Sequence, residues 1–159
     1  MAIKSKQSQK RQSIRQAETD DLPECVCGMM RMVTRAVTQI YDDTMRPSGL
    51  RVTQFSLLSR IDRLGPVSAA NLVDAVHADQ TTLARALKVL EGDGLIHRVP
   101  QADQRVKLIE LTAKGRKRLT DARQNWRQAQ ARMIDQIGRK EWDDMRLRLG
   151  GILGVLGGR

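Results

Sequence analysis

Residues 90–115 constrain the fold of this chain more than any other segment. Gly94 can take the left-handed conformation that ends a helix, and Leu95 can then pack back on Leu90. Two short runs of branched apolar residues follow, separated by a polar turn. The runs cover residues 95–99 and 106–111, and the turn covers 100–105. The segment therefore predicts the end of a helix, a two-stranded ribbon and the start of a new helix.

The helix predicted just before this ribbon, over 79–93 with Asp79 as its N-cap, has two chemically distinct faces. At about 100° per residue, the leucines of this segment gather on one side, which we expect to face the core. The opposite side carries groups that hydrogen-bond to DNA bases and phosphates. These groups are Gln80, Thr81, Thr82, Arg85 and Lys88. An ordinary solvated helix has the same pattern, but the elements on either side favour a recognition helix.

Cap and breaker residues divide the rest of the chain into helices. A long first helix is predicted over about 22–46, with Asp21 as its N-cap and Pro47 as its stop. Thr53 and Ser68 are the predicted caps of two short helices before the recognition helix. After the ribbon, Thr112 caps a long helix with apolar residues at alternating steps of three and four, as in a coiled-coil seam. A last helix follows Gly138, and the two together cover about 113–157.

Together these elements resemble the MarR family of bacterial transcription regulators. The family's wing carries the pattern D-x-R-x-x-x-x-x-L-T followed closely by glycine, and this chain fills it with Asp103, Arg105, Leu111, Thr112 and Gly115. The resemblance implies a mainly α fold with a small β wing, in which a winged helix-turn-helix at about 50–112 lies within a single domain over 20–159. Gln104 stands where many relatives have a second arginine.

The resemblance also implies how such a protein binds DNA. Arg105, at the wing tip, reaches a minor groove, whose negative potential suits arginine, and Asp103 braces it. MarR-type proteins are homodimers whose first and last helices intertwine. We therefore expect a homodimer that binds a pseudo-palindromic operator as a repressor, and a signal that changes the spacing of the recognition helices.

Charge and composition are consistent with a nucleic-acid partner. The net charge is +10, and residues 1–19 hold five Lys or Arg against one Glu, so we expect a disordered basic arm there. No apolar run of membrane-spanning length and no secretory signal is present, which predicts a cytoplasmic protein with no membrane partner. A protein-interaction module and a sequence-independent architectural DNA binder remain alternatives.

A small anionic or phenolic effector is the expected signal, because the resemblance implies a pocket between the dimerisation helices and the winged lobe. Methionine adapts to ligand shape and arginine holds a carboxylate. The candidate lining residues are Met29, Met32, Arg35, Tyr41 and Phe55. The competing interpretation is that the methionines are ordinary core residues.

Thiol oxidation is the second candidate signal. Cys25 and Cys27 lie near the start of the first helix, whose dipole favours a thiolate. The spacing from Cys27 to Arg35 resembles that of the peroxide-sensing cysteine in the organic-hydroperoxide branch of the MarR family. Arg31 and Val52 stand where that branch has tyrosines. Packing thiols are the alternative.

The sequence supports neither a metal site nor a catalytic site. His77 and His97 are the two histidines, and they form no known metal spacing with the cysteines. No nucleophile, phosphate loop or carboxylate pair stands out, so we expect neither enzymatic activity nor a cofactor.

Overall fold

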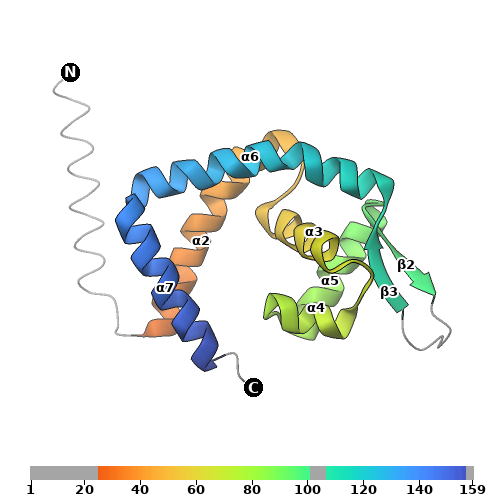
Figure 1. The fold of residues 1–159 in the computed structure, drawn as a ribbon, viewed down its shortest axis with the longest axis horizontal. Helices are drawn as coiled ribbons and strands as arrows, with labels where there is room; N and C mark the ends of the chain where they lie inside the picture. Colours follow the sequence, from red (N-terminus) through yellow and green to blue (C-terminus); the bar gives the residue numbers. More distant parts are fainter. Residues whose placement is uncertain (1–24, 101–106, 157–159) are drawn as a thin grey trace. The chain divides into compact units, whose positions relative to one another are not determined.

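The computed structural model describes residues 25–100 and 107–156. The described elements follow the predicted order, and Figure 1 shows them along the chain. They are α2 (Val26–Met45), η1 (Arg46–Ser48), α3 (Val52–Leu64), β1 (Val67–Ser68), α4 (Ala69–Val76), α5 (Gln80–Gly92), β2 (Ile96–Pro100), β3 (Lys107–Leu111), α6 (Ala113–Ile137) and α7 (Arg139–Leu156). The predicted mainly α fold with a small β wing is confirmed. The basic arm, the cap at Asp21 and the wing-tip residues Asp103 and Arg105 lie outside the described residues.

The chain divides into two compact units, Met1–Val37 and Thr38–Arg159, and helix α2 runs from one into the other. Of the first unit, the structure describes the start of α2. The second unit holds the end of α2 and all later elements. None of the described helices combines the length and the apolar composition that a membrane span requires.

The helix-turn-helix of the second unit consists of α3, α4 and α5, and side-chain caps fix the starts of α4 and α5. Ser68 Oγ accepts the Asn71 N–H at 3.2 Å, and Asp79 Oδ1 accepts the Thr82 N–H at 2.8 Å. Both caps are as predicted. The predicted cap at Thr53 is wrong: α3 begins after Arg51, because Asp42 accepts the Val52 N–H at 2.7 Å from outside the helix.

The wing is an antiparallel sheet in the order β1-β3-β2. Strands β2 and β3 pair in register from Ile96 opposite Leu111 to Pro100 opposite Lys107. The two-residue strand β1, which the sequence did not predict, adds Val67 opposite Ile109. The sheet edge next to α4 is therefore covered by a segment of the helix-turn-helix itself.

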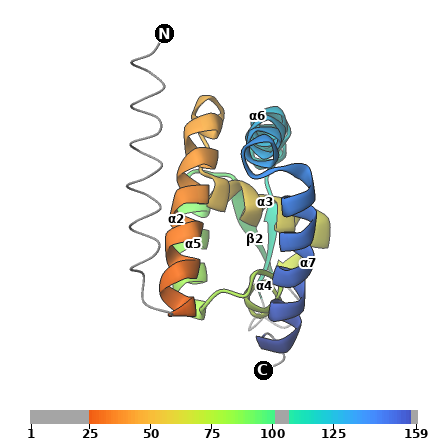
Figure 2. The ribbon, with the colours of Figure 1, turned by 90° about the vertical axis from the view of Figure 1, so that its left-hand side faces the viewer.

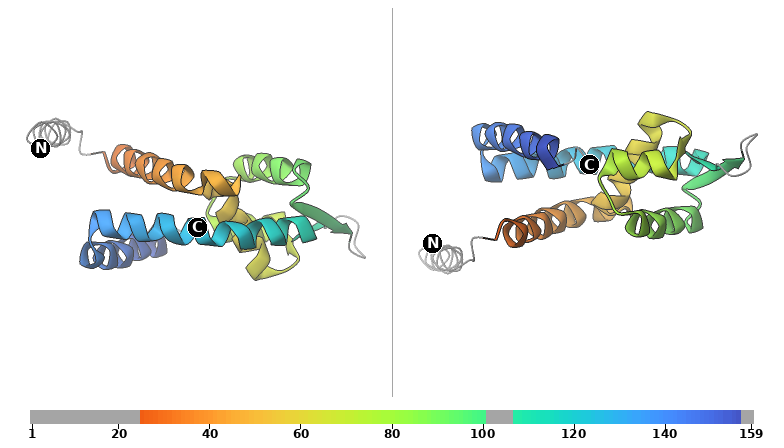
Figure 3. Two further views of the ribbon diagram at one scale, coloured as in Figure 1. Left: turned by 90° about the horizontal axis from the view of Figure 1, so that it is seen from above. Right: turned by 90° about the horizontal axis from the view of Figure 1, so that it is seen from below.

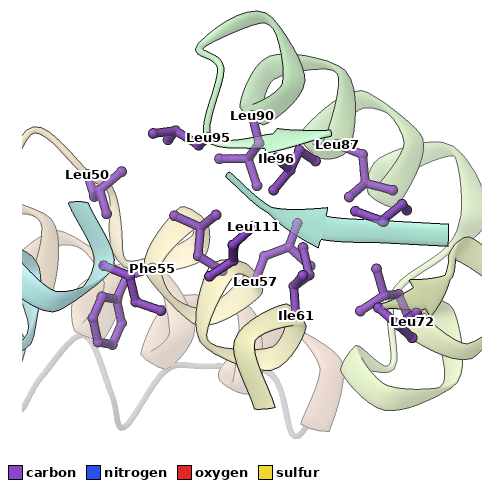
Figure 4. Packing of buried hydrophobic residues seen from close by; sticks show 14 of the residues in the cluster. Leu50, Phe55, Leu57, Ile61, Leu72, Leu87, Leu90, Leu95, Ile96 and Leu111 are labelled. Carbon is purple, nitrogen blue, oxygen red and sulfur yellow. The ribbon is translucent and has the colours of Figure 1, made fainter. Parts of the chain in front are cut away.

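One apolar core joins the helix-turn-helix to the wing, and Figure 4 shows its leucines and isoleucines converging from α3, α5, β2 and β3. The predicted inner face of α5 is confirmed, since Leu83, Leu87 and Leu90 are all buried. Leu119 and Ala122 of α6 also belong to this core. The first part of the stripe on α6, predicted as a coiled-coil seam, thus packs inside its own chain.

The end of α5 is tied to the start of α6. Gly94 takes the left-handed conformation (φ 68°), as predicted, and the Leu95 N–H donates to the Leu90 carbonyl at 2.9 Å. Thr112 Oγ1 donates to the Gly94 carbonyl at 2.7 Å and also accepts the Gly115 N–H at 2.9 Å. A Cβ atom at position 115 would lie 1.9 Å from the Leu95 carbonyl oxygen, so only glycine fits this crossing.

Candidate nucleic-acid interface

The outer face of α5 is the strongest candidate for contact with DNA. While the three leucines of its inner face are buried, the polar residues predicted for base and phosphate contact are all exposed. They are Gln80, Thr81, Thr82, Arg85 and Lys88. The recognition helix of a helix-turn-helix presents such side chains to the major groove from its N-terminal part. The placement of these residues fits the prediction, while their contacts with bases remain a prediction.

The first turn of α5 is held by Asp79. Hydrogen bonds from the side chain and backbone of Thr82 keep the pKa of Asp79 below its usual range. The carboxylate accepts the Thr82 N–H, a group that the helix itself leaves unpaired. This cap fixes the direction in which Gln80 and Thr81 leave the turn.

An ion pair holds strand β2 next to the end of α5, and a second side-chain contact joins the two wing strands. Arg98 of β2 donates to Glu91 near the end of α5 at 3.2 Å, and His97 of β2 lies 3.0 Å from Glu110 of β3. These pairs are solvent-exposed and contribute little stability each. The Arg98–Glu91 pair connects the root of the wing to the recognition helix, whereas the His97–Glu110 contact lies within the wing sheet.

Helices α3 and α6 cross, as the view from above in Figure 3 shows, and a groove lies between them. Its volume is about 630 Å³. The rings of Phe55 and Trp126 stack in it, 5.7 Å apart and inclined by 17°. One turn further along α6, Gln130 accepts a hydrogen bond from Tyr41, and burial raises the pKa of that phenol. Two residues of the predicted effector pocket, Tyr41 and Phe55, thus lie beside neighbouring turns of α6.

The remaining effector and redox candidates belong to the first unit. Met29, Met32 and Arg35 are exposed on α2. Cys25 and Cys27 are free and exposed, and the Gly28 N–H lies 3.5 Å from the Cys25 sulfur. Within the described ranges, no cluster of three His, Cys, Asp or Glu side chains has the geometry to hold a metal ion.

Sequence reasoning missed the arginines of the α3–α6 groove. Arg60 and Arg63 of α3 and Arg123 and Arg127 of α6 line it. Each pair repeats at three or four residues, which puts both members on one face of their helix. That spacing was visible in the sequence. What was not visible is that the two faces meet.

A helix-turn-helix with an exposed polar recognition face, followed by a β-ribbon, defines the winged helix-turn-helix class of DNA-binding proteins. The model of the MarR family matches residues 50–107. The M. tuberculosis transcriptional regulator MosR, solved in complex with DNA, is 40% identical; the match covers 81% of this chain and 93% of MosR, with a TM-score of 0.73. This chain belongs to the MarR family.

Two further comparisons agree with this assignment. YwoH of Bacillus subtilis, an HTH-type transcriptional regulator, is 27% identical over 53% of this chain, and the match spans 61% of YwoH, less than two thirds of its length. A mutant of E. coli MarR in complex with operator DNA is 20% identical with a TM-score of 0.73 over 80% of this chain and 93% of that one, which supports the fold. The relatives compared are transcriptional regulators, and two of them were solved bound to DNA.

Proposed function

We propose that this protein is a homodimeric repressor that binds a pseudo-palindromic operator through α5 and the wing, and that a small effector releases it. The observation that carries the proposal is the division of α5 into a buried leucine face and an exposed face that includes Thr81, Arg85 and Lys88. Arginine binds guanine through two hydrogen bonds, and lysine and threonine add contacts to bases and phosphates. The wing residues Asp103 and Arg105 are assigned to a minor groove on their family pattern alone.

Apolar side chains on α7 support the homodimer. The last two turns of this helix expose Ile152, Leu153, Val155 and Leu156, and Leu147 is 67% exposed. Contiguous apolar faces of this kind mark association sites, and closed two-fold dimers are the commonest assembly. Such a dimer fits a two-fold operator when its two recognition helices lie about 34 Å apart, the spacing of successive major grooves on one side of the DNA.

An anionic or phenolic effector is the proposed signal for release. The groove beside α6 offers aromatic side chains and arginines, which together suit an aromatic anion. From the first unit, Met29, Met32 and Arg35 are the further candidates proposed from the sequence. The effector would act by changing the separation of the two recognition helices in the dimer.

Thiol oxidation is the second candidate for release, favoured by the exposure of both Cys25 and Cys27. Exposed thiolates are the ones that peroxides oxidise. Under this hypothesis a low dose of organic hydroperoxide releases the operator from the wild type, whereas Cys27→Ser stays bound. Release by an aromatic anion, with no response to the peroxide, would leave the thiols without a sensing role.

The experiment that tests DNA readout compares Arg85→Ala with Lys140→Ala, a charge removal on α7 away from the recognition helix. The operator is first selected from a random-sequence DNA pool, and affinities are then measured by fluorescence anisotropy on operator and on random DNA. Arg85→Ala should lose about 1–3 kcal/mol on the operator and much less on random DNA. Equal losses on both would contradict base readout by α5.

A further inference from the structure

The groove between α3 and α6 has the size of a ligand site. Its volume of about 630 Å³ lies within the range of small-molecule sites, roughly 300–1,000 Å³. The walls are regular helices, α3 on one side and α6 on the other. Side chains carried by packed helices hold their positions better than those on loops, so the helical walls of the groove are in place before a ligand arrives.

One end of the groove is aromatic. Phe55 is buried, at 7% exposure, and its ring stacks on Trp126, which is half-buried and lines the groove. The stacked pair fixes the orientation of the indole. A planar ring that enters the groove therefore meets an apolar surface already set for stacking.

The rest of the lining is strongly positive. Four guanidinium groups, those of Arg60, Arg63, Arg123 and Arg127, line the groove with one carboxylate, that of Asp62. Arg123 pairs with Asp62 at 3.2 Å. Among the described residues, the other three arginines pair with no carboxylate, and Arg60 is half-buried. A partly desolvated guanidinium is stabilised by an anion that accepts two parallel hydrogen bonds.

We propose that this groove binds an aromatic compound with a doubly charged anionic group, such as a phosphate monoester. The ring would stack beside Trp126, and the phosphate would lie among Arg60, Arg63 and Arg127. A single carboxylate offers one charge to three unpaired cations, whereas a phosphate monoester offers about two and more acceptor oxygens. The inference rests on the proposed function, since it gives the chemical class of the effector.

Binding is measured on the full-length protein without DNA. Trp142→Phe leaves Trp126 as the one tryptophan, so quenching of its fluorescence reports on the groove. The probes are 4-nitrophenyl phosphate and 4-nitrobenzoate at about pH 8, where the phosphate carries two charges. We expect the phosphate to bind at least about tenfold more tightly. Equal affinities for the two probes would overturn the proposal.

The groove variant removes two of the unpaired arginines, Arg60→Gln with Arg127→Gln. Its matched control, Arg132→Gln with Arg139→Gln, removes the same charge from exposed positions outside the groove lining. The groove variant should lose at least about tenfold in affinity for the phosphate probe, and the control less than about twofold. Equal losses in both would overturn the proposal. If the double variant does not fold, Arg63→Gln, at the exposed rim of the groove, replaces it in the same comparison.

The DNA backbone, rather than a small ligand, is the other anion that could bind these arginines. The affinity of the groove variant for the operator, measured over a range of salt concentrations, distinguishes DNA binding from effector binding at these arginines. We expect the operator affinity to change by less than about twofold, and the slope of log affinity against log salt concentration to stay the same. A slope shallower by about three to four units, as expected when a homodimer loses two arginines from each protomer, would place the arginines on DNA phosphates and overturn the effector site. That result would leave the proposed function intact, because Arg85→Ala tests base readout independently.

Discussion

The winged lobe and helix α7 use the same kind of sequence pattern with opposite results. Apolar residues recur at helical spacing in both, but the lobe buries Leu58, Leu72 and Leu90 completely, at 0% exposure. On α7, Leu153 and Val155 remain 53% and 83% exposed. Figure 2 looks along α6 and shows α7 turning away from its end. Periodicity thus identifies an apolar face without saying what covers it.

The two regions also use glycine differently. Gly115 lies at a crossing where α6 passes directly over the Leu95 carbonyl, whereas Gly150 in α7 has open space where a Cβ would stand. The lobe is assembled by close backbone contact. In α7 three glycines, at 150, 151 and 154, lower the intrinsic stability of the helix, so that its order depends on whatever packs against it.

The largest effect that tests this contrast is expected from Gly115→Ala. The new Cβ would lie 1.9 Å from a backbone oxygen, so the start of α6 has to move, and we expect a loss of more than about 4 kcal/mol in the free energy of unfolding. Gly150→Ala is the matched control and should be neutral or stabilising by up to about 1 kcal/mol. Urea denaturation measures both. Similar values for the two would mean that the crossing tolerates a side chain.

A pair of leucine truncations comes next. Leu90→Ala should lower the free energy of unfolding by about 2–5 kcal/mol, because it opens a cavity in the core of the lobe. Leu153→Ala, at an exposed position, should cost less than about 0.5 kcal/mol in dilute protein. Urea titrations at two protein concentrations provide the measurement. A large and concentration-independent cost for Leu153→Ala would contradict the exposed position of this residue.

Charge on the face of α7 should affect association more than folding. Ile152→Asp with Leu153→Asp is expected to weaken self-association at least about tenfold, or about 1.4 kcal/mol, with little change in helical content. Gln124→Asp with Gln128→Asp adds the same charge at exposed polar positions of α6. Sedimentation velocity compares the two. If both variants associate like the wild type, the apolar face of α7 is not a dimer surface.

The smallest effect concerns the cap of α5. The pKa of Asp79 is lower in the folded protein than in the unfolded chain, so its contribution is complete above the unfolded value, near 3.9, and is lost as the pH falls through the folded value. Asp79→Asn should remove this part of the acid dependence and leave a competent cap. The midpoint of thermal unfolding, measured for both proteins between pH 2 and 7, checks this prediction. An identical acid profile for both proteins would show that the cap bond is absent in solution.

Local chemistry explains what the sequence made predictable. The caps at Ser68, Asp79 and Thr112 and the left-handed Gly94 each depend on neighbours within a few residues, and all four were recognised. The family pattern in the wing then indicated the class of protein.

Features that depend on distant partners were missed. The start of α3 depends on Asp42, ten residues before Val52, and strand β1 is too short to show any alternation. The arginine groove depends on how α3 crosses α6, which no local pattern encodes. For the candidate site, the residue types on α5 were predictable, whereas the positive groove was not.

Hydrogen bonds between the end of α5 and the start of α6 couple a tilt of the long helix α6 to the position of the recognition helix. The Thr112 hydroxyl holds the Gly94 carbonyl, and Lys114 Nζ donates to the Asp93 carbonyl at 2.7 Å. Helix α6 has 25 residues, which corresponds to an axial length of about 37 Å. A tilt of about 5° around its far end, near Gly138, displaces its near end by about 3 Å. The recognition helix follows that displacement, which is comparable to the length of one hydrogen bond to a base.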